Sequence, residues 1–267
     1  MSVLEIERLT VSFHRRDGLR RRITTDCVRD VSLAVARGEV LALFGASGAG
    51  KSLLAHAVMG LLPPNALAGG TMRFDGHVLD APAQAALRGN RIALIPQSVG
   101  HLDPLATVGQ QLRWAARRAG RPMTAPGAVA EALSRFDLAP AVAGTFPHTL
   151  SGGMARRVML AMTMASGADL VLADEPSNGL DADNTARVFR CLKSFAEAGK
   201  AVIVISHDLP AALKIADRVV LLDRGQVVAE ERADAFTSDG EALCAGYARS
   251  IWNALPQNGF SRACHEA

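Results

Sequence analysis

The residues best suited to chemistry lie in the stretch GASGAGKS, residues 45–52, which separates the apolar runs EVLALF and LLAHAVMGLL. It fits the pattern G-x-x-x-x-G-K-[ST], in which small residues let successive backbone N–H groups converge on an anion. The following helix adds free N–H groups and a partial positive charge. The alternative is a glycine-rich turn with a solvated lysine, but the flanking strand and helix patterns favour phosphate binding. We predict a nucleotide phosphate loop made of Gly45, Ala46, Ser47, Gly48, Ala49, Gly50, Lys51 and Ser52.

Two residues of this loop have expected partners elsewhere in the sequence. Lys51 is expected to reach the β- and γ-phosphates, and the Ser52 hydroxyl is expected to bind Mg²⁺. Asp174 ends the apolar run DLVLAD and can hold the same metal, because open α/β sheets bind ligands at the carboxyl ends of their strands. Glu175 follows and can polarise a water for in-line attack on the γ-phosphate. Without the loop, this pair would be an acidic turn before Pro176.

Two more polar residues follow predicted strands. Gln97 ends RIALIPQ and can reach the metal or the attacking water, and His207 follows AVIVIS and can bond the γ-phosphate. Taken singly, each residue is equally well explained as a polar residue at a strand end.

The stretch LSGGM, residues 150–154, predicts a second anion cradle, made of Ser151, Gly152 and Gly153, at the start of a helix. One nucleotide does not need two cradles for its γ-phosphate. We therefore expect this cradle to serve a second nucleotide across a dimer interface. Ser151 is also expected to cap the helix, and the two interpretations are compatible.

The elements that would position these residues follow an α/β pattern. The first 40 or so residues are β-rich, and GGTMRFDGHVLD predicts a hairpin that turns at Asp75-Gly76. An apolar helix is expected over residues 53–62, stopped by two prolines. Helical stretches broken by Pro and Gly dominate residues 98–165, after which strands and helices alternate. The continuous apolar strands of that alternation predict a mainly parallel sheet buried on both faces.

Composition sets broader limits. The 267 residues, 49% of them apolar, predict one large domain or one domain with a sizeable insertion, and a net charge of +3 gives no indication of nucleic-acid binding. The basic run at residues 15–22 is expected to be a solvated hairpin tip or loop rather than a lipid or nucleic-acid patch. The N-terminus alternates like a strand and lacks the order of a signal peptide, so we expect a cytoplasmic protein. The cysteines argue against a zinc site or a disulfide framework, because no CxxC pair occurs among Cys27, Cys191, Cys244 and Cys264.

The motifs occur in the order found in the ATP-binding cassette of ABC transporters. GASGAGKS, Gln97, LSGGM, LADEP, NGLD at residues 178–181 and His207 resemble that family's Walker A, Q-loop, signature, Walker B, D-loop and switch histidine. The resemblance covers about residues 1–235 and leaves residues 236–267 as a short C-terminal tail. It implies an α/β fold, a P-loop NTPase of ABC-cassette type. A mainly parallel sheet core then carries an antiparallel β subdomain and an α-helical subdomain at about 98–165.

The resemblance also implies roles for individual residues. Two cassettes would pair head to tail, as identical or different chains, with each ATP between the phosphate loop of one and the Ser151–Met154 signature of the other. Glu175 would act as the base, His207 would hold the γ-phosphate, and Gln97 would contact the metal or the water. Phe13, after the first strand, would stack on adenine, although the core explains an aromatic residue there equally well.

Details resemble the peptide/nickel import branch of the family, including FPHTLSGGMARRVMLAM and ISHDLPAALKIADRVVLLDRGQVVAE. The branch implies an ATP-hydrolysing importer subunit that uses ATP and Mg²⁺. Its partners would be a second ATPase subunit, two transmembrane permease subunits and a periplasmic or extracellular substrate-binding protein, with no nucleic acid. The location would be the cytoplasmic face of the inner membrane, where the segment after Gln97 would meet a permease helix. The C-terminal region lacks the branch's His-Pro and the cysteine-rich end of many peptide importers, which slightly favours nickel or a metal chelate over a peptide.

Other classes fit less of the sequence. A soluble ABC-type ATPase of translation or DNA maintenance usually carries two cassettes or a long coiled coil, and no long heptad run occurs here. An exporter cassette is usually fused to membrane segments. A small-molecule kinase or GTPase would leave LSGGM unexplained.

Overall fold

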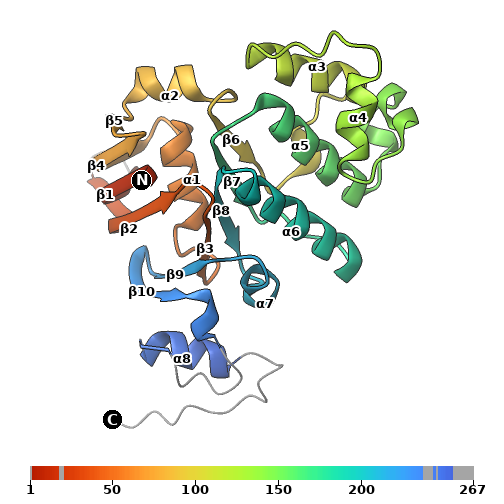
Figure 1. Cartoon of the computed structure of the whole chain (residues 1–267). Helices are drawn as coiled ribbons and strands as arrows, with labels where there is room; N and C mark the ends of the chain where they lie inside the picture. Colours follow the sequence, from red (N-terminus) through yellow and green to blue (C-terminus); the bar gives the residue numbers. More distant parts are fainter. Residues whose placement is uncertain (1, 18–20, 237–242, 245, 255–267) are drawn as a thin grey trace.

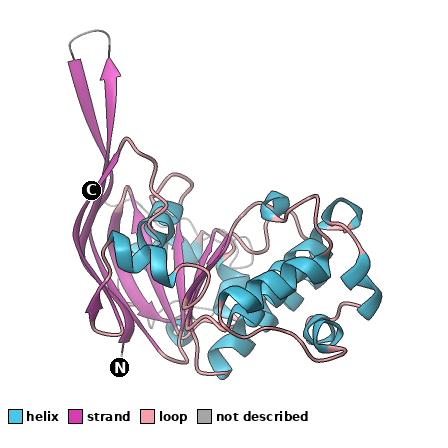
Figure 2. Cartoon of the chain, turned by 90° about the horizontal axis from the view of Figure 1, so that it is seen from above, coloured by secondary structure: helices cyan, strands magenta, loops and turns pink. Residues whose placement is uncertain are grey.

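The computed structural model describes residues 2–17, 21–236, 243–244 and 246–254. Their strands form two sheets, a four-stranded one of order β2-β1-β4-β5 and a six-stranded one of order β10-β9-β3-β8-β7-β6 (Figure 1). Figure 2 shows that most of the helices lie on one side of the two sheets. The α/β prediction with a parallel core and an antiparallel sheet is confirmed.

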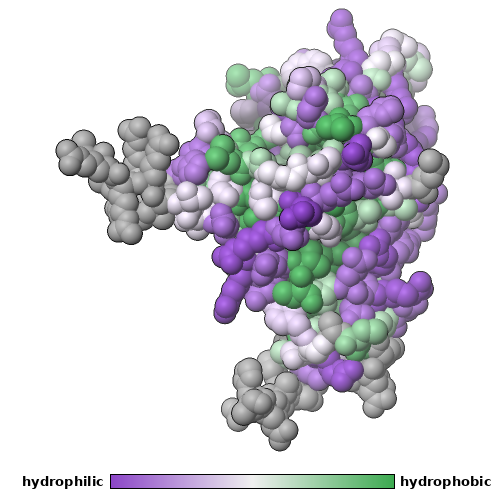
Figure 3. All heavy atoms as spheres, turned by 90° about the vertical axis from the view of Figure 1, so that its left-hand side faces the viewer, coloured by the Kyte–Doolittle hydropathy of each residue, from purple (hydrophilic) through white to green (hydrophobic). Residues whose placement is uncertain are grey.

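The antiparallel sheet consists of β1 (Ser2–Asp17), β2 (Arg21–Ala36), β4 (Ala66–Phe74) and β5 (His77–Val78). Strands β1 and β2 stay paired as far as Asp17 and Arg21, so the basic run falls at the end of a hairpin that projects from the body (Figure 2). Residues 18–20 of that run lie outside the described residues. The predicted turn between β4 and β5 is confirmed, because Asp75 and Gly76 both have positive φ, 48° and 77°. Seen from the side of this sheet, the surface carries many hydrophilic side chains with apolar patches between them (Figure 3).

The six-stranded sheet has a parallel core with one antiparallel edge. Neighbouring strands from β9 through β3, β8 and β7 to β6 run parallel, and only β10 is antiparallel. The carboxyl ends of the parallel strands therefore share one edge. The bounds are β3 (Val40–Gly45), β6 (Ile92–Ile95), β7 (Leu170–Asp174), β8 (Ala201–Ser206), β9 (Arg218–Asp223) and β10 (Gln226–Arg232).

Both faces of this sheet are buried, as the continuous apolar strands predict. In β3, Val40 and Ala42 belong to one buried cluster, while Leu41 and Leu43 belong to the other. The second cluster also contains the inward side chains of the antiparallel sheet and of α1 (Lys51–Met59). Helix α1 is thus packed between the two sheets, and its amino end is fixed at the carboxyl edge of β3.

The bounds of α1 differ from the prediction of residues 53–62. The helix begins at Lys51, because Gly50 takes a left-handed conformation (φ 94°) and serves as its N-cap. It ends at Met59, because Gly60 is also left-handed (φ 62°) and its N–H donates to the carbonyl of Ala57. The end is therefore set by a glycine and not by the prolines that follow.

The segment for which we predict a helical subdomain contains five short helical elements and the long helix α5. Their bounds are η1 (Val99–His101), α3 (Val108–Arg118), α4 (Ala128–Ser134), η2 (Pro140–Gly144), η3 (Pro147–Thr149) and α5 (Gly152–Ser166). A further helix, α2 (Ala81–Leu87), follows the antiparallel sheet.

The C-terminal half adds α6 (Ala182–Glu197), α7 (Leu209–Leu213), η4 (Ala233–Ala235) and α8 (Gly246–Asn253). Helix α8 is part of the predicted tail, yet its Trp252 is 7% exposed and packs edge-on against Phe236, with ring centroids 5.6 Å apart. The tail helix therefore contributes to the main core. None of the helices that the structure describes is both long and apolar enough to span a membrane.

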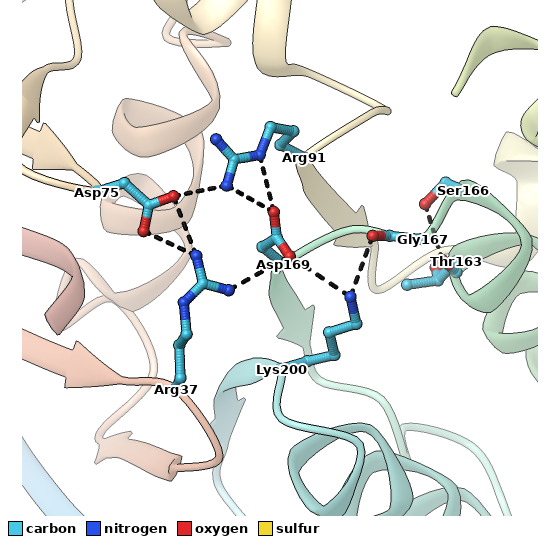
Figure 4. Close-up of polar contacts among 8 residues, drawn as sticks. All are labelled: Arg37, Asp75, Arg91, Thr163, Ser166, Gly167, Asp169 and Lys200. Carbon is cyan, nitrogen blue, oxygen red and sulfur yellow. Dashed lines mark hydrogen bonds and ion pairs between the residues drawn. The ribbon is translucent and has the colours of Figure 1, made fainter. Parts of the chain in front are cut away.

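Ion pairs tie the two sheets together at the amino ends of the parallel strands (Figure 4). Asp169, before β7, pairs with Arg91 at 2.7 Å and with Lys200 at 3.4 Å, and Arg91 also pairs with Asp75 of the antiparallel sheet at 2.5 Å. Arg37 joins Asp75 at 2.9 Å and Asp169 at 3.4 Å. This charged network lies at the opposite end of the strands from the predicted phosphate loop.

Candidate nucleotide and catalytic site

The predicted phosphate loop connects the end of β3 to α1, and two of its glycines are required by close packing. A Cβ atom at Gly45 would overlap the carbonyl oxygen of Leu222 on β9. At Gly50, φ is 94° and a Cβ atom would lie 2.7 Å from the carbonyl oxygen of Cys27. The loop is therefore held between β9 and β2, and the start of α1 faces into it.

The side chain of Lys51 bonds back to the start of this loop. It is buried, and Nζ donates to the carbonyls of Gly45 at 2.8 Å and Ala46 at 3.0 Å. Desolvation lowers the pKa of the Lys51 ammonium, and the negative charges of Glu175 and Asp174 act in the opposite direction. The loop thus holds a buried cation beside two carboxylates.

Ser52 and Asp174 lie together although 122 residues separate them. The Ser52 hydroxyl donates to Asp174 Oδ1 at 3.0 Å. Burial raises the pKa of the Asp174 carboxyl, while the bond from Ser52 acts to lower it. Hydroxyl and carboxylate oxygens are ligands that Mg²⁺ prefers, and a desolvated carboxylate gains from a nearby cation. The two residues therefore fit the magnesium role predicted for them.

Glu175 and His207 form the second pair at this edge. Glu175 has a φ of 47°, a left-handed conformation that is uncommon for a residue with a side chain. Its backbone N–H donates to the carbonyl of Ile205 at 2.8 Å, which fixes β7 to β8 at this point. Glu175 Oε2 lies 2.7 Å from His207 Nδ1, and the His207 side chain is 65% exposed. The two predicted catalytic groups are thus in direct contact.

Gln97 is exposed just beyond the end of β6. Its backbone carbonyl accepts a bond from Arg156 of α5 at 2.6 Å, and Arg156 also donates to the carbonyl of Pro96 at 2.5 Å. The strand order places Gln97 on the same sheet edge as Asp174, because β6 and β7 are adjacent and parallel. Its role toward metal or water stays a prediction.

The second cradle lies at the amino end of α5. Ser151 caps this helix as predicted, since its Oγ accepts a bond from the N–H of Met154 at 3.3 Å. A Cβ atom at Gly153 would lie 2.8 Å from Asn184 Oδ1, whereas Gly152 is open. Among the described residues, no hydrogen bond or ion pair joins residues 151–153 to the loop of residues 45–52. That this cradle serves a second nucleotide stays a prediction.

Phe13 is half-buried on β1, where it pairs with Thr25 and Ala66 and packs against the core cluster between the sheets. This packing accounts for an apolar ring at the position. Stacking on adenine stays a prediction.

Two features were absent from the sequence-based site. One is Arg156, which lies next to Arg157 in the largely apolar helix α5. Adjacent side chains of a helix point about 100° apart, so two neighbouring arginines cover a wide part of the helix surface. In an apolar helix this is a signal that one of the charges is buried. The other is a groove of about 760 Å³ between the core and the helical segment. Its walls include Leu61, Pro96, Leu102, Trp114 and Met159.

Comparisons with known proteins place this geometry in a family. Residues 28–178 match the family model described as ABC transporter. The oligopeptide transport ATP-binding protein OppD of Lactococcus lactis subsp. cremoris (strain SK11) is 33% identical over 265 residues, covering 96% of this chain and 76% of OppD. The glutathione import ATP-binding protein GsiA of Pectobacterium atrosepticum is 37% identical over 246 residues, covering 85% of this chain and only 38% of GsiA.

The fold is similar to that of a solved cassette. The structure of MJ0796, described as the dimeric post-hydrolysis state bound to ADP and Pi, superposes with a TM-score of 0.74 at 25% identity, covering 86% of this chain and 98% of that one. The family model spans more than half of this chain, and OppD is matched over more than two thirds of its length. The chain is therefore an ATP-binding protein of the ABC transporter family.

Proposed function

We propose that this chain is the ATP-hydrolysing subunit of an ABC importer that takes up a small peptide or a peptide-like molecule. The observation that carries the proposal is the convergence at one sheet edge of the phosphate loop after β3, Gln97 after β6, Asp174 and Glu175 after β7, and His207 after β8. Ligands of open α/β sheets bind at this edge.

In this proposal each residue has a defined task. Lys51 and the N–H groups of the loop would bind the β- and γ-phosphates, and Ser52 and Asp174 would hold Mg²⁺, which would supply positive charge beside the phosphates. Glu175 Oε2 is engaged by His207 Nδ1, so Oε1 is the oxygen that accepts the proton of the attacking water. His207 orients this carboxylate and contacts the γ-phosphate through its exposed ring.

Pairing of two cassettes completes the site. Ser151, Gly152 and Gly153 at the start of α5 would bind the γ-phosphate held by the partner's loop. The MJ0796 cassette is described as a dimer, which supports this arrangement.

Attachment to a permease would use the groove of 760 Å³. Trp114 is 53% exposed at its wall, and Leu61 is 42% exposed. Exposed aromatic and aliphatic side chains around a groove suit the apolar face of a partner helix. In this proposal the chain would lie at the inner face of the membrane through its partners.

The cargo proposal follows the names of the relatives, oligopeptide for OppD and glutathione for GsiA. They favour a peptide over the nickel or metal chelate that the C-terminal sequence slightly favours.

The test has two parts. Purified chain should release phosphate from ATP with Mg²⁺, and Glu175→Gln should abolish this release while ATP still binds. A strain that lacks the gene should then lose uptake of a labelled tripeptide and regain it with the wild-type gene but not with Glu175→Gln. Loss of Ni²⁺ uptake with unchanged tripeptide uptake would show that the cargo proposal is wrong.

A further inference from the structure

Arg156 joins two parts of the chain that are about 60 residues apart. Its guanidinium donates from Nη1 to the carbonyl of Pro96 at 2.5 Å and from Nη2 to the carbonyl of Gln97 at 2.6 Å. Those carbonyls directly follow β6 at the nucleotide edge. Arg156 itself lies in the first two turns of α5, the helix that begins beside Ser151. One side chain therefore connects the Gln97 segment to the helix that carries the second cradle.

Stability does not explain this arrangement. Arg156 is 2% exposed, its Nε has no hydrogen-bond partner among the described residues, and no carboxylate among them forms an ion pair with it. Burial lowers the pKa of its guanidinium. A buried charge without a counter-charge costs more free energy than an apolar side chain of similar volume in the same place. The charge is instead suited to holding two particular carbonyl groups.

Residues 96–97, whose carbonyls bond to Arg156, also border the groove. Pro96 lines the 760 Å³ groove together with Leu102 and Met159, and Gln97, the next residue, is exposed at the sheet edge. The two carbonyls bonded to Arg156 thus lie between the groove wall and the nucleotide edge. If a change in the groove or at the nucleotide edge shifts this segment, the bonds from Arg156 of α5 must move or break.

We propose that Arg156 is a positioning residue that transmits movement of the Gln97 segment to the amino end of α5, so that ATP bound in the loop sets the orientation of the Ser151–Gly153 cradle of the same chain. The inference rests on the proposed function. Because both bonds go to backbone carbonyls, they report the position of the segment whatever the Gln97 side chain contacts.

The neighbouring Arg157 provides a matched control. It is also buried, and it donates to the carbonyls of Gly153 at 3.4 Å, Phe136 at 3.2 Å and Asp137 at 2.7 Å. All of these partners lie within the helical segment. Loss of Arg157 removes three bonds from the same helix, against two for Arg156, without cutting the connection to Gln97.

The test is amide hydrogen exchange of Glu175→Gln chains with and without ATP and Mg²⁺, at a concentration where light scattering shows only monomers. In this parent, ATP should raise protection of residues 45–52 and change exchange in residues 96–106 and 151–158. Adding Arg156→Met should keep the first two responses and abolish the response of residues 151–158. Adding Arg157→Met should keep all three, and Arg156→Lys, which retains the charge and a donor, should restore part of the lost response.

Kinetics with Glu175 intact give a second readout. Arg156→Met should lower kcat about tenfold, which corresponds to about 1.4 kcal/mol, and should leave KM for ATP within about twofold. If Arg157→Met does not fold, comparing the response of residues 151–158 in Arg156→Lys and in Arg156→Met still tests the inference. A response of residues 151–158 that survives in Arg156→Met, or that is missing in the parent while residues 45–52 are protected, overturns this inference. Absence of protection at residues 45–52 in the parent would instead contradict the proposed function.

Discussion

Glu175 Oε2 lies 2.7 Å from His207 Nδ1, and this contact joins the ends of two adjacent parallel strands. Asp174, the preceding residue, ends β7 and accepts a bond from the Ser52 hydroxyl. Two consecutive carboxylates therefore serve different partners, Ser52 for Asp174 and His207 for Glu175. This division underlies the separate magnesium and base roles that we propose.

Glu175→Gln should lower kcat for ATP hydrolysis by about 10²- to 10⁴-fold, because the amide cannot accept the proton of the water. ATP binding should be retained, and the closed dimer should accumulate. Phosphate release measures the first effect, and light scattering with ATP and Mg²⁺ measures the second. Full turnover in this variant would show that another group is the base.

Lys51→Ala should weaken ATP binding by about 10- to 100-fold, since a charged hydrogen bond contributes about 1.5–3 kcal/mol. Titration with a fluorescent ATP analogue measures the change in Kd. Lys193→Ala is a suitable control, because Lys193 bonds to Ile215 and Asp217 on another part of the surface. Equal weakening in both variants would contradict the role of Lys51.

Ser151→Arg should abolish hydrolysis and leave the Kd for ATP unchanged. The large cation would fill the cradle that serves the partner's nucleotide, while the loop of its own chain stays intact. Comparing equilibrium ATP binding with phosphate release separates the two effects. A variant that hydrolyses ATP at the wild-type rate would remove the cradle from the mechanism.

Asp174→Asn should stabilise the fold when no nucleotide or Mg²⁺ is added, by on the order of 1 kcal/mol at pH 7. Burial raises the pKa of Asp174, so its ionised form disfavours folding, and the wild type gains stability as pH falls through the raised value. The advantage of Asn should therefore shrink at acid pH. Thermal denaturation across pH 4–8 checks this, and MgATP should reverse the order. A variant less stable than wild type at pH 7 would refute it.

Asp169→Asn should destabilise the fold by about 2 kcal/mol at neutral pH, between the values for exposed and buried pairs. Burial acts to raise the pKa of Asp169, but Arg91, Lys200 and Arg37 outweigh it and lower the pKa. Its contribution is present above the unfolded pKa and is lost as pH falls through the folded one. Urea unfolding at pH 7 and pH 3 measures this loss. Asp234→Asn, which removes an exposed pair with Arg232, should have little effect.

Much of the site could be predicted because the motifs identify strand ends, and parallel strands bring their carboxyl ends to one edge. Ser52 meets Asp174 for this reason. The contacts of Arg156 and of Trp252 could not be predicted, because they depend on the packing of helices against segments distant in sequence. The start of α1 at Lys51 depends on the left-handed φ of Gly50, which a glycine permits but does not require.

The charged network around Asp169 has a practical consequence for labelling this protein. A strand of five residues such as β7 spans about 17 Å, so the turns near Asp169 lie about that far from Asp174 and Glu175. A fluorophore or an affinity handle attached at residue 198, which is exposed in the turn before Lys200, would lie close to this ion-pair network yet remote from the nucleotide edge. The amino ends of the parallel strands are thus the natural place from which to observe this ATPase at work.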